Sequence, residues 1–284
     1  DAAGGSYNVA AGTTLQFGAA RSLASDIAGA GPVGFSNGVI GVTGAYNVSG
    51  GTYVTSACCN TTTVTFGGSV SNVGTTLSVG GGNSTLNFSG ITSGQASAFA
   101  NLTSISNTGS LSFKDGTNFA ALTSLTSGGV TTNLGASNVS VNSLSVSAGV
   151  LTGSGSITVN TGGTFTWYGG AIDGTAASIL ATLSGVTTTG TLGVLGANRM
   201  WDNSGTVTKT FVGCCSANFT LNGTFNNLLG GVFDLKDDAS SGSRTTPGTG
   251  TFNNAGTFLK SLHTTVVNDE VFNPAFNNQA TGVV

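Results

Sequence analysis

The amino-acid sequence predicts an all-β fold, a right-handed parallel β-helix (β-solenoid) with rungs of roughly 20–27 residues. Similar segments recur at about this interval, short runs alternate apolar with small polar residues, and helical patterns are nearly absent. The 284 residues include 47 Gly but only 7 Lys or Arg and 10 Asp or Glu, while 38% are hydrophobic. The chain therefore has enough apolar residues to form a core, but it lacks the charged surface of an average enzyme.

The repeats are clearest in the last third of the chain. Triplets of the form aromatic-Asx-Asn start at Trp201, Phe225, Phe252 and Phe276, at intervals of 24, 27 and 24 residues by subtraction. Alternating runs such as Leu77–Val79 are bounded by Gly, Ser or Asn, and their period of two predicts short strands with one buried face. Stacking these strands would bury their apolar residues in a column inside the solenoid.

Other elements and folds explain the sequence less well. Gln95–Leu102 and Thr175–Leu183 have helical character but are short, which predicts a loop or a cap. A pair of β-sandwiches would also use short strands, but it does not explain triplets that recur in phase. We therefore expect residues 1–284 to form a single elongated β-solenoid domain. Residues 276–284 begin another repeat, which predicts an open repeat at the C-terminal end.

The asparagines of the triplets are candidates for a structural site. At a rung corner, one Asn of each pair would turn the chain, and the other would hydrogen-bond the Asn of the next rung. The predicted ladder comprises Asn203, Asn226, Asn227, Asn253, Asn254, Asn277 and Asn278.

All four cysteines lie in two adjacent pairs, Cys58-Cys59 and Cys214-Cys215. Six or seven rungs separate the pairs, near 30 Å, whereas bridged Cα atoms lie about 4.4–6.8 Å apart, so a bond between the pairs of one chain is disfavoured. Each pair then closes a vicinal ring or cross-links a neighbouring molecule, and we favour the vicinal disulfide. The single His263 is 48 residues beyond Cys215, which argues against a zinc site.

A carbohydrate-active β-helix enzyme, a polysaccharide lyase or a glycosidase, is the main alternative function. A glycosidase needs two carboxylates beside the scissile bond, yet Glu270 is the only Glu of the chain. Asp234, Asp237 and Asp238 offer oxygen ligands for Ca²⁺, but a solvated loop also explains them. We expect no catalytic residue, no metal site and no cofactor. The remaining acidic residues of the second half are Asp173, Asp202 and Asp269.

Two further surfaces are candidates for binding. Trp167 and Tyr168 are adjacent on a predicted strand, so one of them should face solvent, where it could contact a glycan or another partner. The runs Thr61–Thr63 and Thr187–Thr189 raise a third class, ice binding, in which a flat solenoid face carries regularly spaced Thr. These runs do not recur at the rung interval, and Thr is favourable on half-buried strands, so we expect a role in strand formation.

Nearly the whole chain resembles the repeat-rich surface proteins of bacteria that carry parallel β-helices, namely large adhesins and autotransporter-passenger-like chains. The resemblance is carried by repeats such as Val9–Phe17, Tyr46–Thr52, Phe165–Gly174 and Phe252–Phe258. It implies a parallel β-helix and an extracellular location at the cell surface. Together with the open C-terminal repeat and the few charged residues, it predicts a structural protein without enzymatic activity that is a filament subunit or an adhesin stalk. Its partners would be further copies of itself in a head-to-tail homopolymer or the rest of a longer chain, and glycans.

Charge and hydropathy exclude two classes of partner. No basic cluster offers a patch for nucleic acid. No stretch approaches the roughly 18–20 apolar residues of a membrane-spanning helix, so we expect no membrane insertion. The chain begins with Asp1 instead of Met, which fits a mature exported product or a segment of a longer chain.

Overall fold

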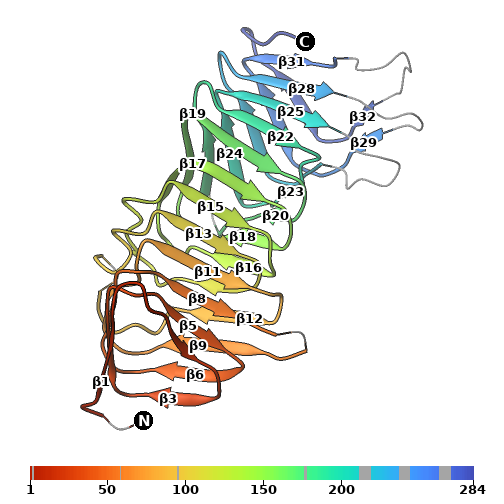
Figure 1. Ribbon diagram of the computed structural model, residues 1–284. Coiled ribbons are helices and arrows are strands. Elements are labelled where there is room, and N and C mark those ends of the chain that lie inside the picture. The colour runs from red at the N-terminus through yellow and green to blue at the C-terminus, as the bar shows by residue number, and fades with distance from the viewer. Residues whose placement is uncertain are drawn as a thin grey trace. The chain divides into compact units, whose positions relative to one another are not determined.

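Figure 1 shows the computed structural model, in which the chain forms stacked rungs of short strands. The structure describes residues 1, 3–57, 59–94, 96–175, 178–210, 219–236, 244–261 and 270–284. These residues contain strands and no helix, and the parallel strands stack as a β-solenoid of about 11 turns. The predicted all-β parallel β-solenoid is confirmed. The chain divides into two compact units, Asp1–Val139 and Ser140–Val284.

The first unit is built from three parallel sheets. One sheet stacks β1 (Ser6–Val9), β4 (Asp26–Gly29), β7 (Tyr46–Val48) and β10 (Val70–Asn72). A second stacks β2 (Leu15–Phe17), β5 (Val33–Ser36), β8 (Thr52–Thr55), β11 (Thr76–Gly80), β13 (Ser104–Asn107) and β15 (Ser124–Ser127). The third stacks β3 (Arg21–Leu23), β6 (Gly38–Val42), β9 (Thr62–Phe66), β12 (Ser84–Asn87), β14 (Ser110–Ser112) and β16 (Thr131–Asn133).

The second unit has the same organisation. One sheet stacks the start of β19 (Ile157–Trp167) with β21 (Ser178–Thr182), β24 (Arg199–Asn203), β27 (Thr224–Asn227), β30 (Thr251–Asn254) and β33 (Ala275–Asn278). The next stacks the end of β19 with β22 (Thr187–Gly190), β25 (Thr206–Thr210), β28 (Val232–Lys236) and β31 (Thr257–Leu259). A third stacks β18 (Val150–Thr152), β20 (Ala171–Ile172), β23 (Val194–Leu195) and β26 (Thr220–Leu221).

Three strands remain. β29 (Arg244–Thr246) pairs in parallel with β32 (Glu270–Phe272), and β17 (Val139–Val146) begins at the last residue of the first unit. The two stretches of helical character contain no helix in their described residues, because 96–101 form turns and β21 occupies most of Thr175–Leu183.

Rung length follows from the residues that pair across successive strands. In the first unit, the paired residues are separated by 18, 19, 25, 28 and 20 positions, and in the second by 23, 21, 24, 27 and 24. The first series is Leu15, Val33, Thr52, Leu77, Ile105 and Leu125. The second series is Val159, Thr182, Asn203, Asn227, Asn254 and Asn278. Loops of different length at the corners account for the spread around the expected 20–27 residues.

Aromatic side chains form columns inside each unit. Phe66 and Phe88 stack with ring centroids 4.7 Å apart in the first unit, and Phe225 and Phe252 do so at 4.7 Å in the second. Parallel pairing places equivalent residues of successive rungs directly above one another, so an aromatic residue repeated at the rung interval stacks on its predecessor. These four rings are fully buried, and their burial drives the winding of the chain.

Glycine is required where one rung lies directly on the backbone of another. Gly190 has φ +138°, and a Cβ there would overlap the carbonyl oxygen of Trp167 in the rung before. Gly248 has φ +133° and lies in the same way on the backbone of Leu221. A side chain at either position would be strained and would separate the two rungs.

Thr188 is an exception to the apolar interior. It pairs with Phe165 and Val207, is fully buried, and its Oγ1 has no hydrogen-bond partner. Thr188→Val should raise the free energy of unfolding by about 1 kcal/mol, because an unsatisfied buried hydroxyl is replaced by a methyl group of similar shape. Urea denaturation of both proteins measures the change.

Thr182→Val is the matched control for Thr188→Val. The Oγ1 of Thr182 donates to Asn203 Oδ1 at 2.8 Å and accepts from Trp201 Nε1 at 3.0 Å. The same substitution should therefore be destabilising at position 182. A lower denaturation midpoint for Thr188→Val would contradict the assignment of an unsatisfied hydroxyl.

Candidate functional site

The second Asn of each triplet forms a continuous ladder inside the second unit. Asn203 Nδ2 donates to Asn227 Oδ1 at 2.9 Å, Asn227 Nδ2 to Asn254 Oδ1 at 2.8 Å, and Asn254 Nδ2 to Asn278 Oδ1 at 2.8 Å. Asn203, Asn227 and Asn254 are fully buried. We call this row the inner ladder. It satisfies the buried amides by hydrogen bonds from rung to rung.

The preceding residue of each triplet forms a second row, the outer ladder. Asn226 Nδ2 donates to Asp202 Oδ1 at 2.7 Å, Asn253 Nδ2 to Asn226 Oδ1 at 2.9 Å, and Asn277 Nδ2 to Asn253 Oδ1 at 3.0 Å. The structure differs here from the expectation that one Asn of each pair turns the chain. Both lie in strands, and the described non-glycine residues with positive φ are Asn37, Cys59 and Leu192. The sequence also did not predict Asp202 as a member of this row.

Trp167 and Tyr168 point to opposite sides of the sheet. Trp167 is fully buried and donates from Nε1 to Gly169 O at 2.8 Å, whereas Tyr168 is 56% exposed. Tyr168 therefore offers the solvent-facing ring at this position, and the possible glycan or partner contact of the pair is restricted to it.

Three of the four cysteines, Cys58, Cys214 and Cys215, lie outside the described residues. Cys59 is exposed and adopts φ +73°. The vicinal and intermolecular disulfides therefore both stay predictions.

The described carboxylates bind groups of neighbouring rungs or turns. Asp173 Oδ1 accepts from the amide of Gly174 at 2.8 Å, and the carboxylate of Asp234 accepts from the amide and hydroxyl of Ser261 at 3.1 and 2.8 Å. Within the described parts of the chain, no group of three or more His, Cys, Asp or Glu side chains could hold a metal ion. The remaining candidates Asp237, Asp238, His263 and Asp269, and the side chain of Glu270, lie outside that description.

Arg199 places a charged side chain inside the second unit, where it is 1% exposed. Its Nε and Nη2 both donate to Asp173 O at 3.2 and 2.5 Å, and Nη2 also donates to Gly153 O at 3.1 Å. Nη1 donates to Gly155 O at 3.2 Å and to Ile179 O at 3.4 Å. One guanidinium therefore joins carbonyl groups from the two preceding rungs to β24.

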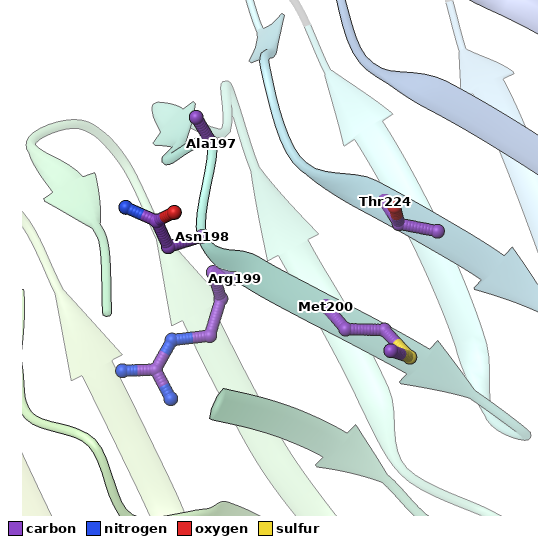
Figure 2. A pocket seen from close by; sticks show the side chains of 5 residues that line it. All are labelled: Ala197, Asn198, Arg199, Met200 and Thr224. Carbon is purple, nitrogen blue, oxygen red and sulfur yellow. The ribbon is translucent and has the colours of Figure 1, made fainter. Parts of the chain in front are cut away.

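A small depression of about 180 Å³ is lined in part by Arg199. Figure 2 shows the Arg199 side chain pointing away from Met200 and Thr224. Burial lowers the pKa of Arg199 to about 10, and the nearby Asp173 carboxylate opposes this shift, so the group is charged at neutral pH. Because all its donors bind carbonyl oxygens, Arg199 serves as a clamp between rungs. The depression is lined by Ala197, Asn198, Arg199, Met200 and Thr224.

A larger depression of about 440 Å³ lies in the first unit. Lys114 Nζ donates to Ile91 O at 2.6 Å, and Asp115 Oδ1 accepts from the amide of Ala136 at 2.8 Å. These charged groups hold the surrounding loops in place. The lining residues are Ser89, Phe113, Lys114, Asp115, Asn133 and Gly135.

The threonines of the second unit correct one expectation from the sequence. The run Thr187–Thr189 does have counterparts at the rung interval, because β19, β22 and β25 pair in register. Its first and last residues face outward, whereas Thr188 faces the core. The repeating pattern is Thr-x-Thr and not a run of three Thr. Paired threonines of successive strands are 23 and 19 residues apart by subtraction. The paired outward residues are Thr164, Thr187 and Thr206 in one row and Thr166, Thr189 and Thr208 in the other.

Fold and site geometry together define the class of this protein as a parallel β-solenoid repeat protein. No protein-family model matches the chain, and no curated protein or solved structure shows significant similarity to it. Among the residues that the structure describes, no helix has the length and apolar character needed to cross a bilayer.

Proposed function

We propose that this chain is an extracellular structural protein, either a subunit of a self-assembling surface filament or the stalk of a surface adhesin. The observation that carries this proposal is the pair of side-chain ladders over residues 202–278, which adds rung-to-rung hydrogen bonds to those of the backbone. Pulling two rungs apart would break both sets of bonds together. A solenoid reinforced in this way suits a protein that carries mechanical load.

The polar and charged groups support the structural function over the alternative of a carbohydrate-active enzyme. Asp202 ends the outer ladder, Asp234 binds Ser261, and the Arg199 donors bind carbonyl groups. A catalytic acid or base needs a proton-transfer position beside a substrate. These groups instead connect rungs, which is what a scaffold requires. A glycan-binding module stays the other alternative, with Tyr168 as its exposed ring.

Self-association would use the face of the last rung. β33 pairs with β30, and Phe276 is 37% exposed although it continues the stack of Phe225 and Phe252. An exposed parallel strand with an apolar residue on its inner face accepts a further strand by backbone pairing. In the proposal, this position is filled either by the rest of a longer chain or by a rung of another copy in a head-to-tail contact, which grows into a filament if it does not close.

Negative-stain electron microscopy of the purified full chain at increasing concentration tests this assembly. We expect filaments or end-to-end oligomers of the native protein and their loss in Phe276→Lys, because a charge would be buried at each joint. Leu229→Lys is the matched control, since Leu229 is 75% exposed at a corner and not on the face of the last rung. Adding a reductant shows whether the cysteine pairs take part.

One outcome would exclude the filament half of the proposal, and another would overturn the proposal as a whole. Isolated particles at every concentration would exclude the filament subunit and leave the adhesin stalk. Release of reducing or unsaturated sugars from polysaccharides by the purified chain would overturn the structural function and establish the enzyme.

A further inference from the structure

The outward threonines of β19, β22 and β25 form a two-dimensional array on the second unit. Strand pairing sets the distance between neighbours within a row at about 4.8 Å, and the strand repeat sets the distance between rows at about 6.6–6.8 Å. We call this array the threonine face. In Figure 1 the three strands lie one above another, followed by β28 and β31.

The hydroxyl groups of the threonine face are available to solvent. None of the six threonine hydroxyl groups forms a hydrogen bond with another group in the part of the chain that the structure describes. Thr164, Thr187 and Thr206 are exposed, and Thr166 and Thr189 are half-buried, as is Thr208. The face therefore presents two rows of three hydroxyl groups, with no charged side chain among the six positions.

The threonine face is rigid. Threonine is branched at Cβ and has few χ1 rotamers, so its hydroxyl and methyl groups keep a nearly fixed position on a strand. The residues between the two rows, Phe165, Thr188 and Val207, are fully buried. Phe165 packs against Trp167 and Trp201 with ring centroids 5.7 and 5.6 Å away. A ligand that matches this spacing would bind without the entropic cost of ordering the protein surface.

We propose that the threonine face binds ice, with ordered water as its ligand. Its two repeat distances are close to those between water oxygen atoms on a prism face of hexagonal ice, so the hydroxyl groups can occupy positions of the lattice. The methyl groups between them leave the adjoining waters to bond with one another. A soluble glycan fits less well, because neither of the two depressions described above is lined by these threonines.

The threonine face ends at the next rung. There, Val232 and Asp234 pair with Thr206 and Thr208, and Asp234 binds Ser261. The Asp234 carboxylate orders water around its own charge and so interrupts the regular array of hydroxyl groups. The array therefore spans three rungs, which predicts weak activity that is better detected by inhibition of ice recrystallisation than by a large depression of the freezing point.

Ice recrystallisation inhibition and partitioning of the fluorescently labelled full chain into growing ice test the proposal. We expect the native protein to keep ice grains small and to enter the ice. Thr187→Lys should abolish both effects, because it places a long charged side chain in the middle of the face. Thr187→Val should weaken them, since it removes one hydroxyl group and keeps the branched shape.

Thr85→Lys is the matched control. Thr85 is half-buried on β12 in the first unit, where it pairs with Thr63 and Ser110, so the same substitution on another sheet should leave ice binding unchanged. The Trp fluorescence spectrum of each variant verifies that the second unit is folded. Absence of both effects in the native protein, or full activity of Thr187→Lys, would overturn the proposal. Neither result bears on filament assembly, which has a separate readout.

Discussion

Replacing Asn227 with Ala should lower the free energy of unfolding of the second unit by roughly 3–5 kcal/mol. The Asn227 amide is fully buried, accepts from Asn203 and donates to Asn254 Oδ1 and to Thr257 O at 2.9 Å. Its removal takes the Asn227 donor from Asn254 Oδ1 and Thr257 O and one of three acceptors from Asn203 Nδ2, in an interior that water does not reach. Denaturant titration followed by Trp fluorescence measures the loss, because both Trp residues lie in this unit.

The neighbouring Asn226 provides the control for Asn227→Ala. Asn226 belongs to the outer ladder and is only half-buried, so water can replace its partners and Asn226→Ala should cost less than about 1 kcal/mol. Asn227→Asp should be at least as damaging as Asn227→Ala, since it buries a charge and turns a donor into an acceptor facing Asn254 Oδ1. Equal losses of stability at positions 226 and 227 would show that the buried inner ladder stabilises the second unit no more than the outer ladder does.

Replacing Arg199 with Ala should have an effect of similar size, roughly 3–5 kcal/mol. The substitution leaves four carbonyl groups on two rungs without their donor, at Gly153, Gly155, Asp173 and Ile179. Arg199→Lys should recover only part of the loss, because an ammonium group has three donors and cannot reproduce the planar fork. The same fluorescence-detected titration measures both variants.

Met200→Ala is the control for Arg199. Met200 follows Arg199 on β24 but is half-buried and points away from it (Figure 2). Met200→Ala also truncates an unbranched side chain at Cβ, but it leaves no buried polar group without a partner, so the expected change is small. If Met200→Ala and Arg199→Ala were equally destabilising, loss of packing would explain both results, and the clamp between rungs would be excluded.

The sequence was sufficient to predict the fold and the asparagine ladder of the triplets. Both depend on residues that recur at a visible interval. The triplets that start at Phe225, Phe252 and Phe276 have the same length and the same order. Parallel pairing therefore places Phe above Phe and Asn above Asn in successive rungs. The corner role of one Asn was wrong, since a strand continues through both residues and Gly provides most of the positive φ angles in the described chain.

Arg199 and the threonine face could not be predicted in the same way. Arg199 has no equivalent one rung later, where Gly223 is followed by Thr224, so no repetition marks it. Its role depends on carbonyl groups that are 20–46 residues away in sequence. The threonine rows are interrupted by Phe165 and Val207 and have unequal spacing, and only the pairing register shows that they align.

The two ladders also carry a direction, and the first triplet sets it. The indole N–H of Trp201 can only donate, so it obliges the Thr182 hydroxyl to give its own hydrogen to Asn203, and each later inner amide then donates toward the C-terminus. The Asp202 carboxylate can only accept, so the outer amides all donate toward the N-terminus. Their dipoles oppose one another. A strand added out of register by one residue would therefore meet donor with donor and acceptor with acceptor, so the triplets encode polarity and alignment as well as adhesion between rungs.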